Sequence, residues 1–163
     1  MMSDKSYAQT YLGVIFKITL QQQGYEVSEK GRYIIAEKEN KRYIIQKVCR
    51  LLSSNGLVDE SSVIEVKKSV VEKLREEARK QSGQCQPAIA FGVCKYEYAD
   101  AEVVIVPVEA FEGDKPAFLS ETKRGYFFNY RHINGGGLEK AISRAAVRIQ
   151  YDNRCRGDFY EII

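Results

Sequence analysis

The sequence predicts a mixed α/β domain in which helices flank a sheet, and two observations lead to this fold class. Segments with apolar residues at helical spacing alternate along the chain with short runs rich in β-branched residues. The 163 residues are 44% hydrophobic and 29% charged, which is the balance of a folded globular chain. Because this length is enough for one core and short for two, we expect a single domain over residues 1–163.

The first fifty residues predict a helix followed by three antiparallel strands. Lys5–Gln23 has its apolar residues at helical spacing, and Gly24 ends the segment. Turns are expected at Lys30-Gly31 and Glu39-Asn40. They separate three short β-type runs: Tyr25–Ser28, Tyr33–Glu37 and Arg42–Cys49. Three runs joined by such short turns indicate an antiparallel meander.

The middle of the chain predicts a second helix and a pair of buried strands. After a polar loop over Leu51–Glu60, the helix is expected to begin at Asp59, Ser61 or Ser62 and to end near Gln81. Its inward stripe would comprise Val63, Val66, Val70, Leu74 and Ala78. Ala88–Cys94 and Val103–Val108 are apolar and rich in β-branched residues, as strands buried on both faces are.

The last fifty residues predict a β/α extension of this core. Phe111–Thr122 reads as a loop, Gly125–Arg131 as a strand and Leu138–Tyr151 as a third helix. The tail, Phe159–Ile163, fits either a last strand or a docking segment. The predicted order is therefore α-β-β-β-α-β-β with a C-terminal β/α extension.

The net charge of +3 is distributed unevenly along the chain. Residues 1–50 carry +4, residues 51–122 carry −5 and residues 123–163 carry +4. On the predicted third helix, Lys140, Arg144 and Arg148 recur every four residues. If the two basic ends share one face, that face would suit phosphate groups. The alternative is an ordinary solvated surface, and the sequence leaves both open.

Composition excludes several classes of protein. No apolar run approaches the roughly 20 residues of a membrane-spanning helix, and we expect no membrane partner and no secretory signal. Cys49, Cys85, Cys94 and Cys155 lack C-x-x-C spacing, so we expect no zinc site and a reduced, cytoplasmic chain. A single histidine, His132, excludes metal sites built from several histidines of one chain.

Residues 13–50 contain three short motifs, one on the predicted helix and two on the predicted strands. The helix reads Gly13-Val14-Ile15-Phe16-Lys17, a Gly24-Tyr25-Glu26-Val27 strand follows, and the third strand reads Tyr43-Ile44-Ile45-Gln46-Lys47. With the order of elements, this text resembles the PD-(D/E)XK nucleases, which have the restriction-endonuclease-like fold. The Mrr-like and archaeal Holliday-junction-resolvase-like branches are the most similar. The resemblance implies a nuclease-like core over residues 5–110 and an added segment over residues 111–163.

The resemblance also implies which residues stand at the family's active site. There, two or three carboxylates hold Mg²⁺ and a lysine orients the attacking water. In this chain Lys17 stands where the family has an acidic residue on its first helix. Tyr33 stands where the family has an aspartate on the second strand, and Gln46 where it has an acidic residue on the third strand. Val48 stands at the lysine position, and Lys47 lies one residue early. We therefore expect no metal or other cofactor, with Tyr33 and Gln46 close together on paired strands and Lys17 near them.

Three functions follow, of different classes. The first is a catalytically degenerate protein that binds DNA or RNA backbone weakly, or serves as a structural component of a nucleic-acid-processing or defence system. Its expected contacts are Lys38, Lys41, Arg42, Arg50, Lys140, Arg144 and Arg148. The second is an active Mg²⁺-dependent endonuclease whose acids have migrated to Glu26, Glu29, Glu37 or Glu39. The third is a self-associating protein, a homodimer or larger complex, with no nucleic-acid role.

Overall fold

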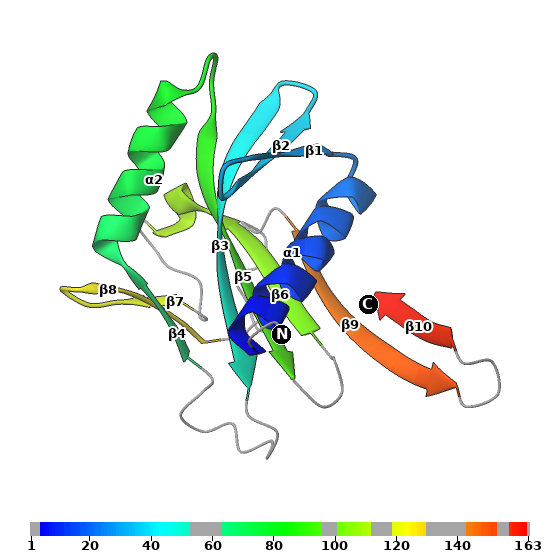
Figure 1. Ribbon diagram of the computed structural model, residues 1–163. Helices are drawn as coiled ribbons and strands as arrows, with labels where there is room; N and C mark the ends of the chain where they lie inside the picture. The colour runs from blue at the N-terminus through cyan, green and yellow to red at the C-terminus, as the bar shows by residue number, and fades with distance from the viewer. Residues whose placement is uncertain are drawn as a thin grey trace.

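The computed structural model describes residues 4–52, 63–95, 101–111, 119–129, 143–152 and 157–162 (Figure 1). The first part of the chain forms α1 (Asp4–Gln22), β1 (Glu26–Lys30), β2 (Tyr33–Lys38), β3 (Lys41–Leu52), β4 (Val63–Lys67) and α2 (Lys68–Lys80). The rest forms β5 (Gln86–Lys95), β6 (Ala101–Pro107), the 3₁₀ helix η1 (Val108–Phe111), β7 (Leu119–Glu121), β8 (Gly125–Asn129), β9 (Ser143–Asp152) and β10 (Gly157–Ile162).

Seven of the strands form one mixed sheet in the order β1-β2-β3-β5-β6-β9-β10. The β1, β2 and β3 strands are an antiparallel meander, β3 runs parallel to β5, and the remaining pairs are antiparallel. The turns of the meander have left-handed backbone at Gly31 (φ 60°) and Glu39 (φ 53°). This is the mixed α/β class that the sequence predicts.

The first helix, α1, covers one face of the sheet, crossing β3, β5 and β6 (Figure 1). Its apolar side chains are buried against alternate residues of the strands: Leu12, Phe16 and Leu20 are 0% exposed and share a core cluster with Ile34 and Ile45. The helix approaches β5 closely because Gly92 has no side chain. A Cβ atom at Gly92 would lie 2.7 Å from Phe16 Cζ. We call this side of the sheet the α1 face.

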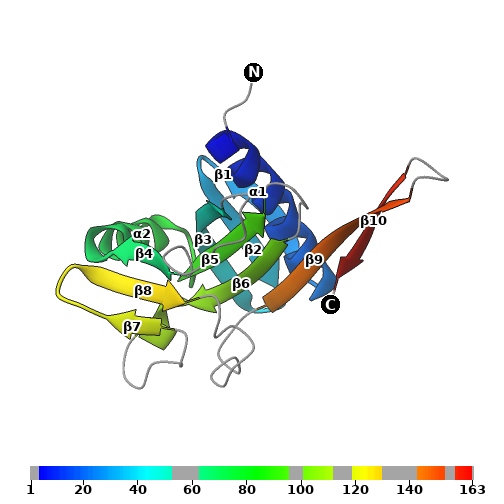
Figure 2. The ribbon, with the colours of Figure 1, turned by 90° about the horizontal axis from the view of Figure 1, so that it is seen from below.

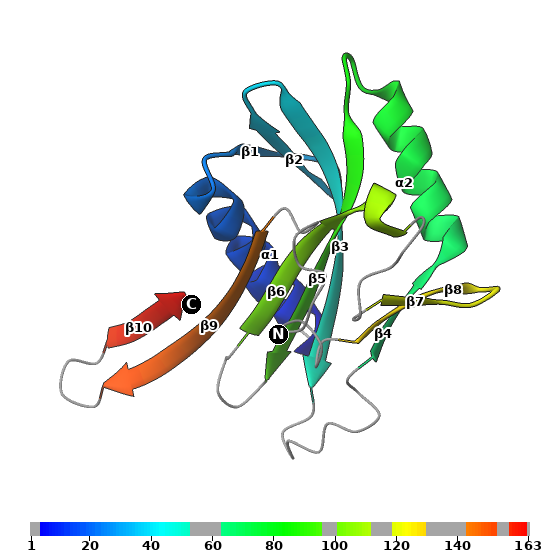
Figure 3. The same ribbon diagram turned by 180° about the vertical axis from the view of Figure 1, so that it is seen from behind.

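The second helix, α2, covers the other face, together with η1 (Figure 3). Val71, Leu74 and Ala78 are buried there, and they pack in a cluster that contains Tyr33 and Ile44. Since neighbouring residues of a strand point to opposite faces, β3 divides its side chains between the two helices. We call this side the α2 face.

The second helix begins later than the sequence predicts. Residues 63–67 form β4, and α2 starts at Lys68. Val63 and Val66, which were expected on the helix, lie on the strand, and Val66 is buried. The helical interpretation failed because β4 is held by a distant partner, β8, in a small sheet of order β4-β8-β7. The spacing of apolar residues within a five-residue segment cannot predict pairing with a strand so far along the chain.

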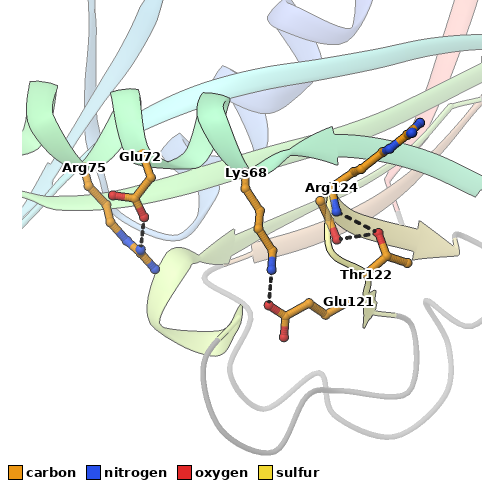
Figure 4. A network of polar contacts seen from close by, with 7 residues as sticks. Lys68, Glu72, Arg75, Glu121, Thr122 and Arg124 are labelled. Atoms are coloured by element: carbon orange, nitrogen blue, oxygen red, sulfur yellow. Dashed lines mark hydrogen bonds and ion pairs between the residues drawn. The ribbon is translucent and has the colours of Figure 1, made fainter.

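The small sheet is tied to the first turn of α2. Lys68 Nζ lies 2.9 Å from Glu121 Oε2 on β7 (Figure 4). The backbone N–H of Lys68 also donates to the Arg124 carbonyl. Thr122 and Arg124 form the tight turn between β7 and β8. Figure 2 shows the β7–β8 hairpin beside β4, with which β8 pairs, and Figure 1 shows it near the start of α2. The predicted strand over Gly125–Arg131 is confirmed for residues 125–129.

The predicted third helix over Leu138–Tyr151 is wrong where the structure describes it. Residues 143–152 form β9, which pairs with β6, and the tail forms β10, which pairs with β9. Arg144 and Arg148 stand four residues apart, a spacing that puts two residues on one face of either a helix or a strand. Around them, apolar residues alternate at 145, 147, 149 and 151, which is the strand period. The C-terminal extension is therefore β-structure in its described part and continues the core sheet.

Among the described helices, none combines the length and the apolar character that a membrane crossing requires.

Candidate nucleic-acid interface

The strand register shows where Tyr33 of β2 and Gln46 of β3, the residues at the expected active-site positions, lie relative to each other. Ile34 stands opposite Ile45, so Tyr33 and Gln46 occupy the next positions on the two antiparallel strands. Tyr33 is buried in the cluster of the α2 face. Gln46 lies two residues after Ile44, a member of that cluster, so the two residues lie on the same face of β3. The expectation that Tyr33 and Gln46 are neighbours on paired strands, on one face, is confirmed.

The expected place of Lys17 beside this pair is wrong. Lys17 projects from α1, and α1 covers the opposite face of the sheet. Lys47 follows Gln46 on β3, so it lies on the α1 face with Lys17. A methyl group at Gly13 of α1 would lie 3.8 Å from Lys47 Nζ, which places the Lys47 side chain against the helix.

The α1 face brings Lys17 and Lys47 together around one carboxylate, Glu29. Lys17 Nζ lies 2.8 Å from Glu29 Oε1, and their side chains are 34% and 53% exposed. The hydrogen bond from Lys17, then the Lys17 charge and, more weakly, the Lys47 charge hold the pKa of Glu29 below its usual value. We call Lys17, Glu29 and Lys47 the lysine cluster. It is half-exposed and carries one net positive charge.

The lysine cluster fits a phosphate group better than a magnesium ion. Mg²⁺ takes six oxygen ligands and is usually held by one or two carboxylates together with substrate phosphates. The cluster has one carboxylate, already paired with an ammonium, and a second ammonium nearby. Among the described residues no group of three or more His, Cys, Asp or Glu side chains is placed to hold a metal.

Two of the other predicted contacts have partners inside the fold. Lys38 Nζ donates to the Gln23 carbonyl at 2.6 Å and lies 5.5 Å from the centre of the Tyr25 ring. Arg42 Nε lies 3.1 Å from Glu37 Oε1, and Arg42 also donates to the Ser82 carbonyl at 3.1 Å. These contacts hold the end of α1 and the loop after α2 to the meander. Lys38 and Arg42 therefore have structural partners that compete with nucleic acid.

The remaining predicted contacts are scattered. Lys41 is exposed at the β2–β3 turn, and Arg50 is half-buried further along β3. Arg144 and Arg148 lie on β9, where their register partners are Val104 and Glu161. Lys140 and His132 lie outside the described residues. The basic stripe of a third helix is thus replaced by two arginines on a strand.

Sequence reasoning did not single out Glu29 as the partner of Lys17. Glu29 was one of four carboxylates that could have replaced a missing acid. The available signal was the alternation in β1, where Val27 and Glu29 share the face that α1 covers. What the sequence does not contain is the angle at which α1 crosses the sheet, and that angle brings Lys17 to Glu29.

Solved structures include proteins with a similar arrangement of elements. The fold is similar to that of Hjc, a Holliday junction resolvase from the archaeal hyperthermophile Archaeoglobus fulgidus, with a TM-score of 0.46 and 12% identity. The alignment covers 72% of this chain and 88% of the resolvase. No protein-family model matches the sequence, and no curated protein matches it significantly.

Proposed function

We propose that this protein is a catalytically degenerate, restriction-endonuclease-like protein that binds nucleic-acid backbone through the lysine cluster. The observation that carries the proposal is the pair of ammonium groups, Lys17 and Lys47, around the single carboxylate of Glu29. Lysine is a phosphate ligand of the point-charge type, so such a surface binds backbone without reading sequence. Binding of this kind is weak and falls steeply with salt, because each contacted phosphate releases counterions.

The proposal predicts binding without cleavage. A metal-dependent nuclease needs carboxylates around its ion, and the family positions in this chain carry Lys17, Tyr33 and Gln46. The alternative of migrated acids draws on Glu26 and Glu37, which stand opposite each other on β1 and β2. Arg42 pairs with Glu37, and this guanidinium opposes a cation at that position.

The test combines a cleavage assay with a binding titration. Duplex and single-stranded DNA and RNA are incubated with Mg²⁺ or Mn²⁺, and fluorescence anisotropy measures affinity between 25 and 200 mM salt. We expect intact substrates and an affinity that weakens on changing both Lys17 and Lys47 to glutamine, with the log–log salt slope shallower by up to about 2 units. The matched control is Lys73→Gln, which removes an exposed lysine from α2.

Each result leads to a different conclusion. Metal-dependent cleavage that is lost in Glu26→Gln or Glu37→Gln would establish the active endonuclease instead. If Lys73→Gln weakens binding equally, nucleic acid contacts a diffuse positive surface, and the lysine cluster is not a specific binding site.

One observation favours a second candidate, self-association. Val14 and Ile18 on the outer side of α1 are 48% and 38% exposed, whereas the other large apolar residues from Tyr11 to Leu20 are buried or half-buried. They lie one helical turn apart, so together they form an apolar strip that a second copy would bury. Sedimentation of the wild type and of Val14→Gln/Ile18→Gln tests this candidate. A dimer that the double substitution dissociates would support it, and a monomeric wild type would exclude it.

A further inference from the structure

A cleft of about 570 Å³ lies on the α2 face, between the end of α2, the segment that leads into β5 and the start of η1. Its volume is within the range of roughly 300 to 1,000 Å³ that small-molecule sites occupy. It is on the other side of the sheet from the lysine cluster, and the proposed function makes no use of it.

The floor of the cleft is apolar. Ala78 and Val108 are 4% and 2% exposed, and Pro87 and Pro107 lie beside them. Two proline rings and a valine present surfaces without hydrogen-bonding side chains. Pro87 is only half-buried, so a planar ring placed against it would remove its remaining apolar area from water.

One wall of the cleft carries two guanidinium groups from α2. Arg75 and Arg79 are one helical turn apart and both line the cavity. Arg75 also pairs with Glu72, further back on the helix (Figure 4). Among the described residues, none forms an ion pair with Arg79. Arginine binds phosphate by paired, charge-assisted hydrogen bonds, and two arginines suit a dianion better than a single carboxylate.

The rim supplies groups that recognise a base. The amide side chains of Gln84 and Gln86 line the cleft, and Glu109 lines it from η1. An amide can donate to and accept from the edge of an adenine, and a carboxylate accepts from an exocyclic amino group. Burial raises the pKa of the Cys85 thiol, so this part of the wall stays neutral and adds no negative charge against an anion.

The segment between α2 and β5 is held in place before any ligand arrives. Lys30 Nζ donates to Gln81 Oε1 at 3.2 Å, and Arg42 donates to the Ser82 carbonyl at 3.1 Å. Gly83 adopts left-handed backbone, with φ 77°, which a side chain would disfavour. A wall fixed by these contacts loses little conformational entropy on binding.

From the apolar floor, the paired guanidiniums and the amide rim, we propose that this cleft binds a nucleoside 5′-monophosphate group. The base would lie on Pro87, Pro107 and Val108, with the phosphate at Arg75 and Arg79. The same chemistry is offered by a free mononucleotide and by the 5′-phosphorylated end of a strand. This inference goes beyond the proposed function and stands if the lysine cluster binds nothing.

Isothermal titration calorimetry with adenosine monophosphate and with adenosine tests the proposal. We expect the monophosphate to bind the wild type at least tenfold more tightly than adenosine does, because the guanidiniums contact only the phosphate. Arg79→Gln should weaken monophosphate binding by about tenfold and leave adenosine binding unchanged, since one charge-assisted contact is lost. The matched control, Lys80→Gln, removes a neighbouring charge that does not line the cleft and should bind as the wild type does. Equal unfolding midpoints in urea would establish that both variants are folded.

Two trinucleotides that differ only in a 5′-phosphate distinguish the sources. If the phosphorylated one binds more tightly than its 5′-hydroxyl partner, and Arg79→Gln abolishes the difference, the ligand is a strand end. If only the free mononucleotide shows dependence on Arg79, the ligand is the free nucleotide. Adenosine binding as tightly as its monophosphate, no binding of the monophosphate at millimolar concentration, or equal affinities of wild type and Arg79→Gln would each overturn the proposal.

Discussion

Each face of the sheet buries an apolar cluster under a helix, but the two faces differ where β3 passes the start of β2. On the α1 face, Ile45 is followed two residues later by Lys47, which lies near the Lys17–Glu29 pair. On the α2 face, Ile44 is followed by Gln46 beside Tyr33, and the Gln46 amide donates to the neighbouring Lys47 carbonyl at 3.1 Å. One face therefore presents two ammonium groups at these positions, and the other presents the neutral side chains of Tyr33 and Gln46. A motif that is continuous in sequence is divided by the period of the strand, and its two halves cannot serve one site.

Both faces of the sheet should contribute similarly to the free energy of unfolding. Leu20 on the α1 face and Leu74 on the α2 face are both 0% exposed, so they are a matched pair. Leu20→Ala and Leu74→Ala should each lower the free energy of unfolding by about 2 to 5 kcal/mol, through lost burial and a residual cavity. Urea denaturation measures both. A loss below about 1 kcal/mol for one of them would show that its helix contributes little to the core.

A smaller loss of stability is expected from crowding α1 against β5. At Gly92, an added methyl group would lie 2.7 Å from Phe16 and 3.1 Å from Leu12. Gly92→Ala should therefore destabilise the protein by roughly 1 to 3 kcal/mol, the usual cost of overpacking. Gly31→Ala provides a contrast, because nothing lies within 4 Å of its added methyl group and its cost is backbone strain alone. An unchanged midpoint for Gly92→Ala would mean that α1 does not lie so close to the sheet.

These contacts also show which parts of the structure the sequence could predict. The α1 helix and the β1–β3 meander are set by local signals: helical spacing, Gly24 at the helix end, and short turns at 30–31 and 39–40. By contrast, β4 and β9 are strands because partners far along the chain pair with them, β8 and β6. In β4 the segment is too short to separate helical from strand spacing, so tertiary pairing decides. In β9 the alternation over residues 145–151 is a local strand signal, but the basic residues at every fourth position fit a helix equally well.

The candidate site, like the fold, was predictable only where local sequence signals determine it. Register and alternation place Tyr33 beside Gln46, and both follow from turn positions in the sequence. The association of Lys17 with Glu29 depends on how a helix crosses a sheet, which packing determines. The cleft at Arg79 depends on three separate segments meeting, and no local pattern records this.

Removing the negative charge from the lysine cluster should strengthen binding. Glu29→Gln frees Lys17 from its ion pair and raises the net charge of the cluster by one. We expect nucleic-acid affinity to rise by roughly two- to fivefold at low salt, with the gain shrinking as salt screens the charges. Anisotropy at 25 and 150 mM salt measures both effects, and Glu26→Gln on the other side of β1 is the matched control. Weaker binding by Glu29→Gln would mean that Glu29 positions the lysines instead of opposing the phosphate.

The smallest effect expected is a dependence of stability on pH. The folded-state pKa of Glu29 lies below its ordinary 4.5, so the ion pair stabilises the fold above that pH. The contribution is lost as pH falls from 4.5 through the lowered pKa, because the carboxyl is then protonated in both states. Wild type and Glu29→Gln should thus differ slightly in thermal midpoint at pH 6 and converge at the acidic end. A difference that is constant across this range would contradict the pairing.

The most direct test moves one ammonium group between the faces. In the double variant Gln46→Lys/Lys47→Gln, composition and net charge are unchanged, but the lysine leaves the α1 face for the α2 face. If the lysine cluster is the interface, the variant should bind duplex DNA as weakly as Lys47→Gln alone, with a salt slope about one unit shallower than that of the wild type. Urea denaturation establishes that the variant is folded. Wild-type affinity and slope in the folded double variant would contradict the account, because the face on which the charge lies would then not matter.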